Sequence, residues 1–237
     1  MGKKVRTFFA SDLHGSERCF AKLLNVPRIY KANVIIVGGD VSGKMIIPII
    51  EVGGGEYRAR FLGEEIVVRG RSGLEKLVDK IRAVGYYPYV TDRRGLEELE
   101  SSDRKLEEIF EELIVESIRR WIKLADEKMR GLNVKFFMMP GNDDPYIVED
   151  LLKESELIVN PDRGVVMVDE YHEMLSLGVS NITPWNCPRD LPEEEIGKLI
   201  DSIASSLERP EKAIFNIHVP PYGTNIDLAS KLDENIF

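Results

Sequence analysis

The sequence predicts an α/β fold, of the α+β kind in which helices flank separate sheets. Short apolar runs alternate with helical patterns along most of the chain. The runs are too apolar to leave one face of a sheet exposed to solvent, so we expect sheets covered on both sides. The 237 residues are 43% hydrophobic, enough to bury one sizeable core. We therefore expect a single domain over residues 1–237.

The first elements predict a strand, a helix and a second strand. VRTFFA at 5–10 is a short apolar run, and VIIV at 34–37 is another. Between them Phe20, Leu23 and Leu24 fall on one face of a helical pattern. This order is typical of α/β proteins.

The second half of the chain repeats this alternation. A helical stripe from Ile196 to Leu207 precedes the last apolar run. Each run is bounded by Gly, Pro, Asn or Asp, as strands are. The predicted strands are VKFFMM at 134–139, LIV at 157–159, VVMV at 165–168, MLSLGV at 174–179 and AIFNI at 213–217.

Residues 44–131 depart from this rhythm and are predicted to form an insertion. GGGEYRARFLGEEIVVRG alternates polar and apolar residues around Leu62-Gly63, which indicates a β-hairpin. Two helical patterns follow, one from Leu74 to Ile81 and one from about 96 to 130. The second is expected to cover the core or a partner, including a second copy of the chain.

The charge balance restricts the ligands that the protein can attract. The chain has 32 basic and 41 acidic residues, a net charge of -9, which argues against a general polyanion binder. Residues 56–95 contain nine Lys or Arg and six acids, a local excess of +3. This excess either draws an anionic substrate toward the core or is an ordinary surface of mixed charge.

Cysteine usage and hydropathy predict a cytoplasmic protein. Cys19 and Cys187 fit neither a disulfide framework nor a zinc-ribbon spacing. No apolar run approaches the roughly 18 residues of a membrane span, and the N-terminus does not read as a signal peptide. We expect no membrane partner.

Polar residues of a restricted kind follow four of the predicted strands. The segments are FFASDLHG (8–15), IIVGGDVSG (35–43), FMMPGNDDP (137–145) and IFNIHVPP (214–221). In open α/β sheets the carboxyl ends of strands form the ligand-binding edge. We therefore expect the following side chains to converge: Asp12, His14, Asp40, Asn142, Asp143, Asp144 and His218.

This set of side chains suits a transition metal. Carboxylates and imidazoles together favour Mn, Fe or Zn over Cu(I) or Ca. An Asp that bridges two ions ~3.5–4 Å apart lets the pair polarise a phosphoryl oxygen and activate a water. Asp40, after Gly38-Gly39, is the natural bridge.

Each fragment alone also has an ordinary structural explanation. Asp12 could cap the following helix, and Asp40 could belong to a simple turn. A lone His218 is more often a satisfied structural histidine than a ligand. The coincidence of four such fragments at four strand ends favours one shared metal site.

The ordered fragments resemble the calcineurin-like metallophosphoesterase superfamily. They are D-x-H at Asp12-Leu13-His14, GGD ending at Asp40, GN-x-D at 141–144, and the later His218. The resemblance runs from about residue 5 to 224, interrupted by the insertion. Within the superfamily it is greatest to archaeal-type predicted phosphoesterases with GNDDP and HVPPYGT segments.

The resemblance implies a four-layer sandwich of two packed mixed β-sheets flanked by helices, with a two-metal site. Asp12 and His14 would bind the first ion, and Asp40 would bridge. Asn142 and His218 would bind the second ion, while Asp144 would support the Asn-bearing loop. Mn²⁺ is the first choice of metal, with Fe, Zn, Ni and Mg as alternatives.

Two departures from the family pattern bear on activity. Asp143 stands where most members have a histidine that contacts phosphate and protonates the leaving oxygen, so we expect weaker leaving-group assistance. Asp143, Asn142 and Asp40 form the expected catalytic set.

No G-H-x-H motif follows His218. The chain looks truncated relative to its family, and we expect one metal site to be weak or empty.

The leading functional hypothesis is a metal-dependent phosphoesterase that hydrolyses a phosphate mono- or diester. The alternative is a catalytically weak or inactive scaffold of this fold that acts as a binding module. Nucleotides, cyclic nucleotides, lipid-derived phosphodiesters and nucleic-acid ends all fit the hypothesis as substrates.

Overall fold

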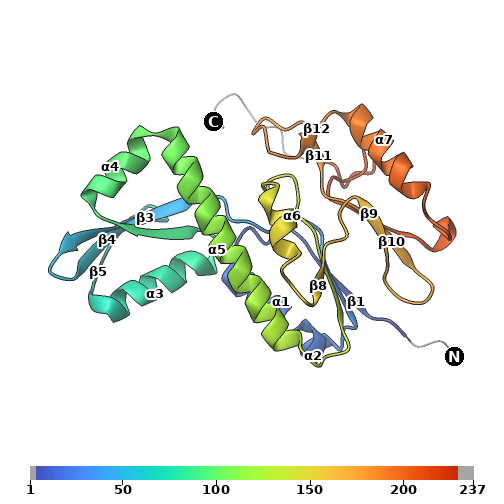
Figure 1. Ribbon diagram of the computed structural model, residues 1–237, viewed down its shortest axis with the longest axis horizontal. Coiled ribbons are helices and arrows are strands. Elements are labelled where there is room, and N and C mark those ends of the chain that lie inside the picture. The colour runs from blue at the N-terminus through green and yellow to red at the C-terminus, as the bar shows by residue number, and fades with distance from the viewer. Residues whose placement is uncertain (1–3, 229–237) are drawn as a thin grey trace.

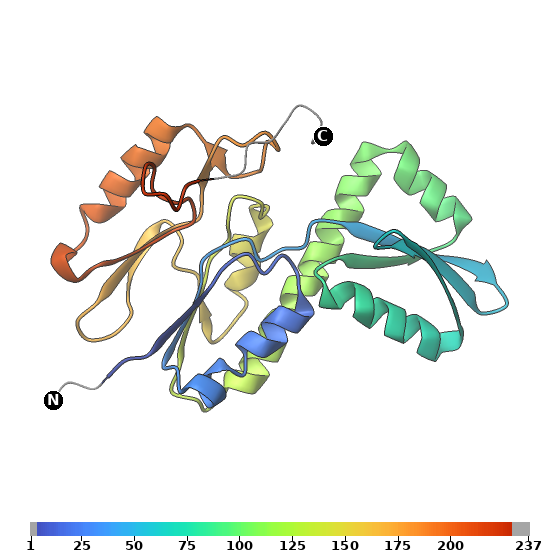
Figure 2. The same cartoon turned by 180° about the vertical axis from the view of Figure 1, so that it is seen from behind.

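Two packed β-sheets form the core of the computed structural model, which describes residues 4–228 (Figures 1 and 2). The first sheet has the order β1-β2-β7-β8, and all its pairings are parallel. Its strands are β1 (Thr7–Ala10), β2 (Val34–Val37), β7 (Lys135–Met138) and β8 (Ile158–Val159). The expectation of two mixed sheets is thus wrong for this one, because each connection between its strands crosses over through helices.

The second sheet is mixed, with the order β13-β10-β9. β10 runs parallel to β13 and antiparallel to β9. A short parallel pair, β11 with β12, lies beside this sheet (Figure 1). The strands are β9 (Gly164–Met167), β10 (Glu173–Leu177), β11 (Ser180–Asn181), β12 (Asp190–Leu191) and β13 (Ile214–Ile217).

Helices cover the outer face of both sheets. On the first sheet these are α1 (Glu17–Leu23), α2 (Val26–Tyr30), α5 (Asp103–Met129) and α6 (Ile147–Leu152). On the second sheet α7 (Glu193–Ala204) packs against β10, and the 3-10 helix η1 (Pro210–Lys212) precedes β13. Within residues 4–228, no helix combines the length and hydropathy needed to cross a bilayer.

Strand β2 shows why the first sheet has no solvent-exposed face. Ile35 and Val37 pack into the cluster formed with the helices, whereas Val34 and Ile36 pack with Met174 between the two sheets. Because side chains alternate along a strand, a run that is apolar at every position must be buried on both faces. The prediction of sheets covered on both sides is confirmed here.

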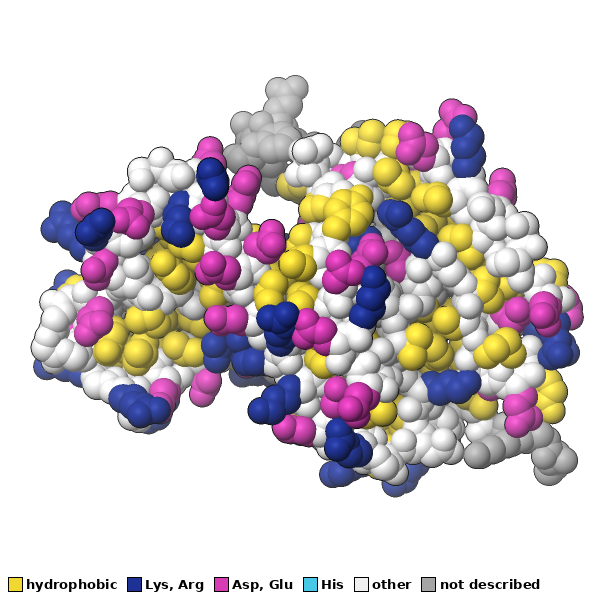
Figure 3. Space-filling view, in the orientation of Figure 1, with side chains coloured by type: hydrophobic (Ala, Val, Ile, Leu, Met, Phe, Trp, Pro, Cys, Tyr) yellow, Lys and Arg dark blue, Asp and Glu magenta, His cyan; other side chains and the backbone are white. Residues whose placement is uncertain are grey.

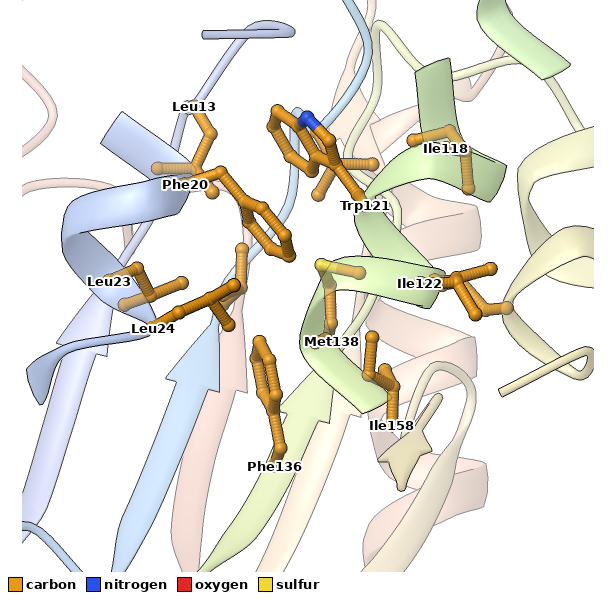
Figure 4. Packing of buried hydrophobic residues seen from close by; sticks show 14 of the residues in the cluster. Leu13, Phe20, Leu23, Leu24, Ile118, Trp121, Ile122, Phe136, Met138 and Ile158 are labelled. Carbon is orange, nitrogen blue, oxygen red and sulfur yellow. The ribbon is translucent and has the colours of Figure 1, made fainter. Parts of the chain in front are cut away.

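The helical layer is joined by an aromatic contact. Phe20 of α1 stacks on Trp121 of α5, with ring centroids 4.1 Å apart and planes 5° apart (Figure 4). Both side chains are fully or almost fully buried. Offset or stacked aromatic pairs of this kind add about 1 kcal/mol beyond the area that they bury. The contact fixes α5 against the helix that follows the first strand.

A separate lobe projects from the core between β2 and α5 (Figure 1). We call residues 46–101 the insertion lobe. Its sheet has the order β5-β4-β3-β6, and the predicted hairpin is confirmed at Leu62 and Gly63, whose φ angles are 52° and 81°. The elements are β3 (Ile46–Gly53), β4 (Glu56–Phe61), β5 (Glu64–Arg69), α3 (Gly70–Ala83), β6 (Tyr87–Thr91) and α4 (Arg93–Ser101).

Two strands of the lobe were not predicted. β3 and β6 pair in parallel, and each contains a proline, Pro48 opposite Tyr89 and Pro88 opposite Ile47. A proline weakens the sequence signal of a strand because its nitrogen cannot join the hydrogen-bonded ladder. The surface of the lobe mixes Lys and Arg with Asp and Glu (Figure 3), in agreement with a mixed-charge surface.

The predicted helix from 96 to 130 is two helices. They meet at Ser102, whose hydroxyl accepts a hydrogen bond from the Lys105 backbone at 3.3 Å and so starts α5. Farther along α5, Ile118, Trp121 and Ile122 are buried against the core. Residues 44–131 therefore comprise the insertion lobe and a long helix that belongs partly to the core.

Candidate metal centre

Four loops that follow strands of the core meet at one end of the two sheets. Backbone hydrogen bonds join the first two loops: the Asp12 N–H donates to the Gly39 carbonyl at 3.0 Å, and the His14 N–H donates to the Asp40 carbonyl at 2.9 Å. A cavity of about 560 Å³ opens beside them. Its lining is Asp12, His14, Asp40, Ser42, Gly43, Lys44, Phe110, Asn142, Asp143, Thr183, Trp185 and Cys187.

The predicted acids and histidines form two groups that share Asp40. In the first group, one ligand atom from each of Asp12, Asp40 and His218 lies within 4.8 Å of the others. In the second group, the same holds for His14, Asp40 and Asp143. Asp40 turns one oxygen to each group: Oδ1 lies 3.3 Å from His218 Nε2, and Oδ2 lies 3.7 Å from His14 Nε2.

Backbone strain is concentrated at these residues. Among residues 4–228, eight non-glycine residues have positive φ, and Asp12, His14 and Asp40 are three of them, at 57°, 42° and 52°. Such conformations cost of order 1–3 kcal/mol each and tend to persist at functional sites. Ser16, rather than Asp12, caps α1 by accepting from the Cys19 N–H. The simple capping explanation for Asp12 is thereby excluded.

Glycines bring the loops into contact. A Cβ on Gly39 would lie 2.5 Å from His218 Nδ1, and one on Gly141 would lie 2.2 Å from Asp40 Oδ1. Neither neighbour could move without leaving the cluster. The glycines of the GGD and GN fragments therefore leave room for side chains delivered by other strands.

His218 is oriented by a backbone carbonyl. Its Nδ1 lies 2.9 Å from the Gly38 carbonyl oxygen, which can only accept, so Nδ1 carries a proton and Nε2 faces Asp40 and Asn142. Burial opposes the charged imidazolium, but the hydrogen bond and negative charge of Asp40 outweigh burial and raise the pKa of His218 to about 9. The raised pKa favours an imidazolium among the clustered carboxylates, and Nε2 would have to lose its proton to bind a metal ion.

Asp40 shows the reciprocal effect. Burial by itself would raise the pKa of its carboxyl group, but the hydrogen bond and charge of His218 hold that pKa below its usual value. The backbone N–H of Asp143 also donates to Asp40 Oδ1, at 3.1 Å. The carboxylate at the shared position is therefore kept ionised.

Asn142 faces the first group through its amide oxygen. Oδ1 lies 3.0 Å from His218 Nε2, and Nδ2 donates to Asp190 Oδ1 at 3.0 Å. The loop that carries Asn142 is held by Asp144, a fully buried side chain. Asp144 accepts from the backbone of Gly141 at 2.7 Å and of Val41 at 2.9 Å. Asp144 supports the Asn-bearing loop in the way the resemblance implies.

Asp143 contacts two side chains, Lys44 and Cys187, that the sequence did not predict to belong to the site. Lys44 Nζ lies 2.5 Å from its Oδ2, and the Cys187 thiol donates to its Oδ1 at 3.0 Å. Burial opposes the charge of Lys44, but Asp143 raises the pKa of that ammonium overall. Burial and the nearby Asp143 raise the pKa of Cys187 to about 11. Asp143 is thus one member of an ion pair.

Other features of the site lie outside the predicted set. Lys44 follows the GGD fragment closely and could have been read from the sequence as a nearby cation. Thr183, Trp185 and Cys187 reach the cavity from a distant loop, and no local motif marks them. His172 pairs with Asp169 in the turn between β9 and β10, apart from the site.

The donors present fit a divalent transition metal. Carboxylate oxygens, imidazole nitrogens and an amide oxygen make the mixed set that Mn, Fe or Zn accept. Several carboxylates crowd together, and among residues 4–228 His14 Nδ1 is a buried nitrogen without a hydrogen-bond partner. The sequence holds no histidine after His218, and the expectation that one metal site is weak or empty stays a prediction.

Comparison with known proteins gives a distant homologue. No model of a known protein family matches the chain. An uncharacterized protein of Methanocaldococcus jannaschii, MJ1162, is 32% identical over 123 residues, which is 52% of this chain and 50% of that protein. The match therefore spans about half the length of the curated relative.

A solved crystal structure is similar to this chain, with a TM-score of 0.48 and 14% sequence identity. The superposition covers 92% of this chain and 70% of the solved chain.

Proposed function

We propose that the protein is a metal-dependent phosphoesterase that hydrolyses a phosphate mono- or diester. The observation that carries the proposal is the sharing of Asp40 between two groups of potential ligands, one oxygen turned toward each. A carboxylate placed in this way can bridge two ions. The four layers of the core and the order of the ligand-bearing loops agree with a metallophosphoesterase-like fold, which we propose as the finer description.

The ligands are assigned as the resemblance implies. In the geometric groups Asp12 falls with His218, although its Oδ1 also lies 3.7 Å from His14 Nε2. Asp12 and His14 would hold one ion and Asn142 and His218 the other, with Asp40 between them. The chemistry that bound divalent ions supply at such a site is polarisation of a phosphoryl oxygen and a lowered pKa of water. Mn²⁺ is the proposed metal because the donor set mixes oxygen and imidazole nitrogen.

The cavity suits an anionic substrate once its carboxylates are neutralised. Lys44 is the one Lys or Arg among the described residues of its lining, and its ammonium lies at the Asp143 side of the cavity. It can attract a phosphate oxygen as a point charge. Trp185, with 66% of its surface exposed, provides an aromatic face at the rim for a base or another planar group. A nucleotide or a similar phosphate ester fits this lining.

Hydrolysis of bis(4-nitrophenyl) phosphate and 4-nitrophenyl phosphate, with and without Mn²⁺, tests the proposal. We expect Mn²⁺ to stimulate hydrolysis and Asp40→Asn to abolish most of the stimulation, by ~1000-fold if several kcal/mol of metal assistance are lost. Asp150→Asn is the matched control, because it neutralises an exposed carboxylate of α6 that pairs with Lys153. Equal activity in Asp40→Asn and the parent would contradict the proposal.

The alternative, a binding module without turnover, has one observation in its favour. Asp143, at the position of the family's proton donor, is tied to Lys44 and Cys187. Under this alternative the parent binds Mn²⁺ but hydrolyses neither ester above the Asp40→Asn level.

A further inference from the structure

A segment beside the second sheet lines part of the cavity and also holds Asn142. Residues 180–191 run from β11 to β12, and we call them the clamp segment. The Arg189 N–H donates to the Asn142 carbonyl at 3.2 Å, and its guanidinium donates to the Asp144 carbonyl at 2.9 Å. Arg189 is fully buried and also pairs with Glu149 at 2.7 Å. The clamp segment is therefore anchored firmly beside the Asn-bearing loop.

Within this segment Asp190 is the residue that meets the Asn142 side chain. Its Oδ1 accepts from Asn142 Nδ2 at 3.0 Å. Its Oδ2 accepts from the Thr183 N–H at 2.9 Å, the Thr183 hydroxyl at 2.5 Å and the Cys187 N–H at 3.1 Å. The carboxylate is held at both oxygens and cannot turn without losing several hydrogen bonds.

The chemistry of an amide gives this contact a consequence. An Asn side chain has one oxygen that can bind a cation and one NH₂ group that cannot. A carboxylate only accepts hydrogen bonds, so the group that faces Asp190 must be the NH₂, and the oxygen must face His218. We propose that Asp190 is a positioning residue that selects the metal-binding face of Asn142. The proposal rests on the proposed function, in which Asn142 is a metal ligand.

Asp190→Asn makes the proposal testable with little change in shape. The backbone N–H groups of Thr183 and Cys187 can only donate, so the oxygen of the new amide must stay with them. Its NH₂ group then faces Asn142, which has to turn its own oxygen away from the site. Loss of such a partner typically costs a metal site 10- to 100-fold in affinity, so we expect about that loss for one Mn²⁺ ion in calorimetric titration.

The reciprocal exchange distinguishes positioning from a general structural role. In Asn142→Asp alone, two carboxylates would face each other at the 3.0 Å contact, and we expect weakened Mn²⁺ binding as well. In the double variant Asn142→Asp with Asp190→Asn, the NH₂ of residue 190 donates to the new carboxylate, whose other oxygen faces the site. We expect this variant to recover near-parental affinity. Failure to recover it would overturn the proposal.

Thr183→Ala is the matched control. It removes one donor to Asp190 but leaves the Asp190–Asn142 contact, so metal affinity should stay within a few-fold of the parent if positioning is the role. If Asp190 serves only to hold the loop, Thr183→Ala should weaken Mn²⁺ binding as much as Asp190→Asn does. That result would also overturn the proposal.

A second readout needs no metal. In the metal-free parent the side-chain amide protons of Asn142, followed by ¹⁵N NMR, should exchange slowly with water because one is bonded to Asp190. In Asp190→Asn we expect faster exchange, and unchanged exchange would overturn the positioning role. If the parent binds no Mn²⁺ at all, the proposed function fails, and this readout still decides the role of Asp190.

Discussion

The two groups of the candidate site are supported by different parts of the molecule. The first group, Asp12, Asp40 and His218, is oriented by the core alone, through the Gly38 carbonyl and the glycines of neighbouring loops. The second group, which contains His14 and Asp143, lies where the core meets the insertion lobe. The difference shows that a lobe inserted between two core elements can influence one half of a site and leave the other to the core.

The second group is supported by short contacts between the insertion lobe and the core loops. The Ser16 hydroxyl donates to the Ala83 carbonyl at 2.7 Å, and the Gly43 N–H donates to the Tyr87 hydroxyl oxygen at 2.6 Å. Burial raises the pKa of that Tyr87 hydroxyl well above its usual value. Gly85 lies against His14 so closely that a Cβ on it would be 1.9 Å from the His14 carbonyl oxygen. The lobe therefore packs against the loops that carry His14 and Lys44.

Asp40→Asn should weaken metal binding at both groups, because Asp40 belongs to both. We expect this substitution to weaken both Mn²⁺ ions together and to have the largest effect of the set. Calorimetric titration measures the number of ions bound and the affinity of each. Loss of a single ion, with the other unaffected, would contradict the bridging position of Asp40.

His14→Ala and His218→Ala should separate the groups. Each removes one imidazole, and we expect each to weaken a different Mn²⁺ ion by ~10- to 100-fold, with the double variant losing both. The same titration, carried out on the two single variants and the double, checks this. If both single variants weaken the same ion, the two groups are one site.

Gly85→Ala tests the support that the lobe gives to the second group. The new methyl group would meet the His14 carbonyl, and we expect a loss of ~1–3 kcal/mol in the free energy of unfolding from the clash, beyond the backbone cost. We also expect weaker binding of the ion held by His14, with little change at His218. Urea unfolding and Mn²⁺ titration measure the two effects.

Gly53→Ala is the control for this comparison. Its φ of 96° is close to the 95° of Gly85, but a Cβ there would meet nothing within 4 Å. The two substitutions share the cost of positive φ and differ in the clash. Equal losses of stability would mean that the lobe does not press on the His14 loop.

Asp143→His should produce the smallest change. An imidazole at this position can protonate a leaving oxygen, so we expect turnover of an alkyl phosphate ester to rise several-fold more than that of a nitrophenyl ester. Lys44 would also lose its partner in the ion pair. Steady-state rates on the two ester classes give the comparison. An equal change on both would show that leaving-group protonation is not what this position controls.

The candidate site could be predicted from the sequence as far as its residues follow strands directly. Asp12, Asp40 and His218 each come shortly after a strand, so a local pattern was enough to place them at one edge. Asp190 could not be found in this way, because it meets Asn142 across 48 positions of sequence through a segment with only two-residue strands. Contacts of this kind are set by tertiary packing.

The same limit applies to the fold. The core strands were readable because they are apolar at consecutive positions, whereas the proline-bearing strands of the lobe were not. The length of the predicted helix from 96 to 130 was wrong because its apolar stripe continues past Ser102, and only the capping hydrogen bond shows the break.

Helix α5 has a consequence for how the molecule unfolds. Its 27 residues make a rod of roughly 40 Å that contacts α4 in the lobe and α6 in the core. Phe110 meets Tyr87 of the lobe edge-to-face, and two turns later Ile118 lies in the core cluster. Release of the lobe would expose the first turns of an apolar stripe whose later turns are packed in the core. We therefore expect lobe and core to share a single cooperative transition, with the slowest native-state hydrogen exchange along the middle turns of α5.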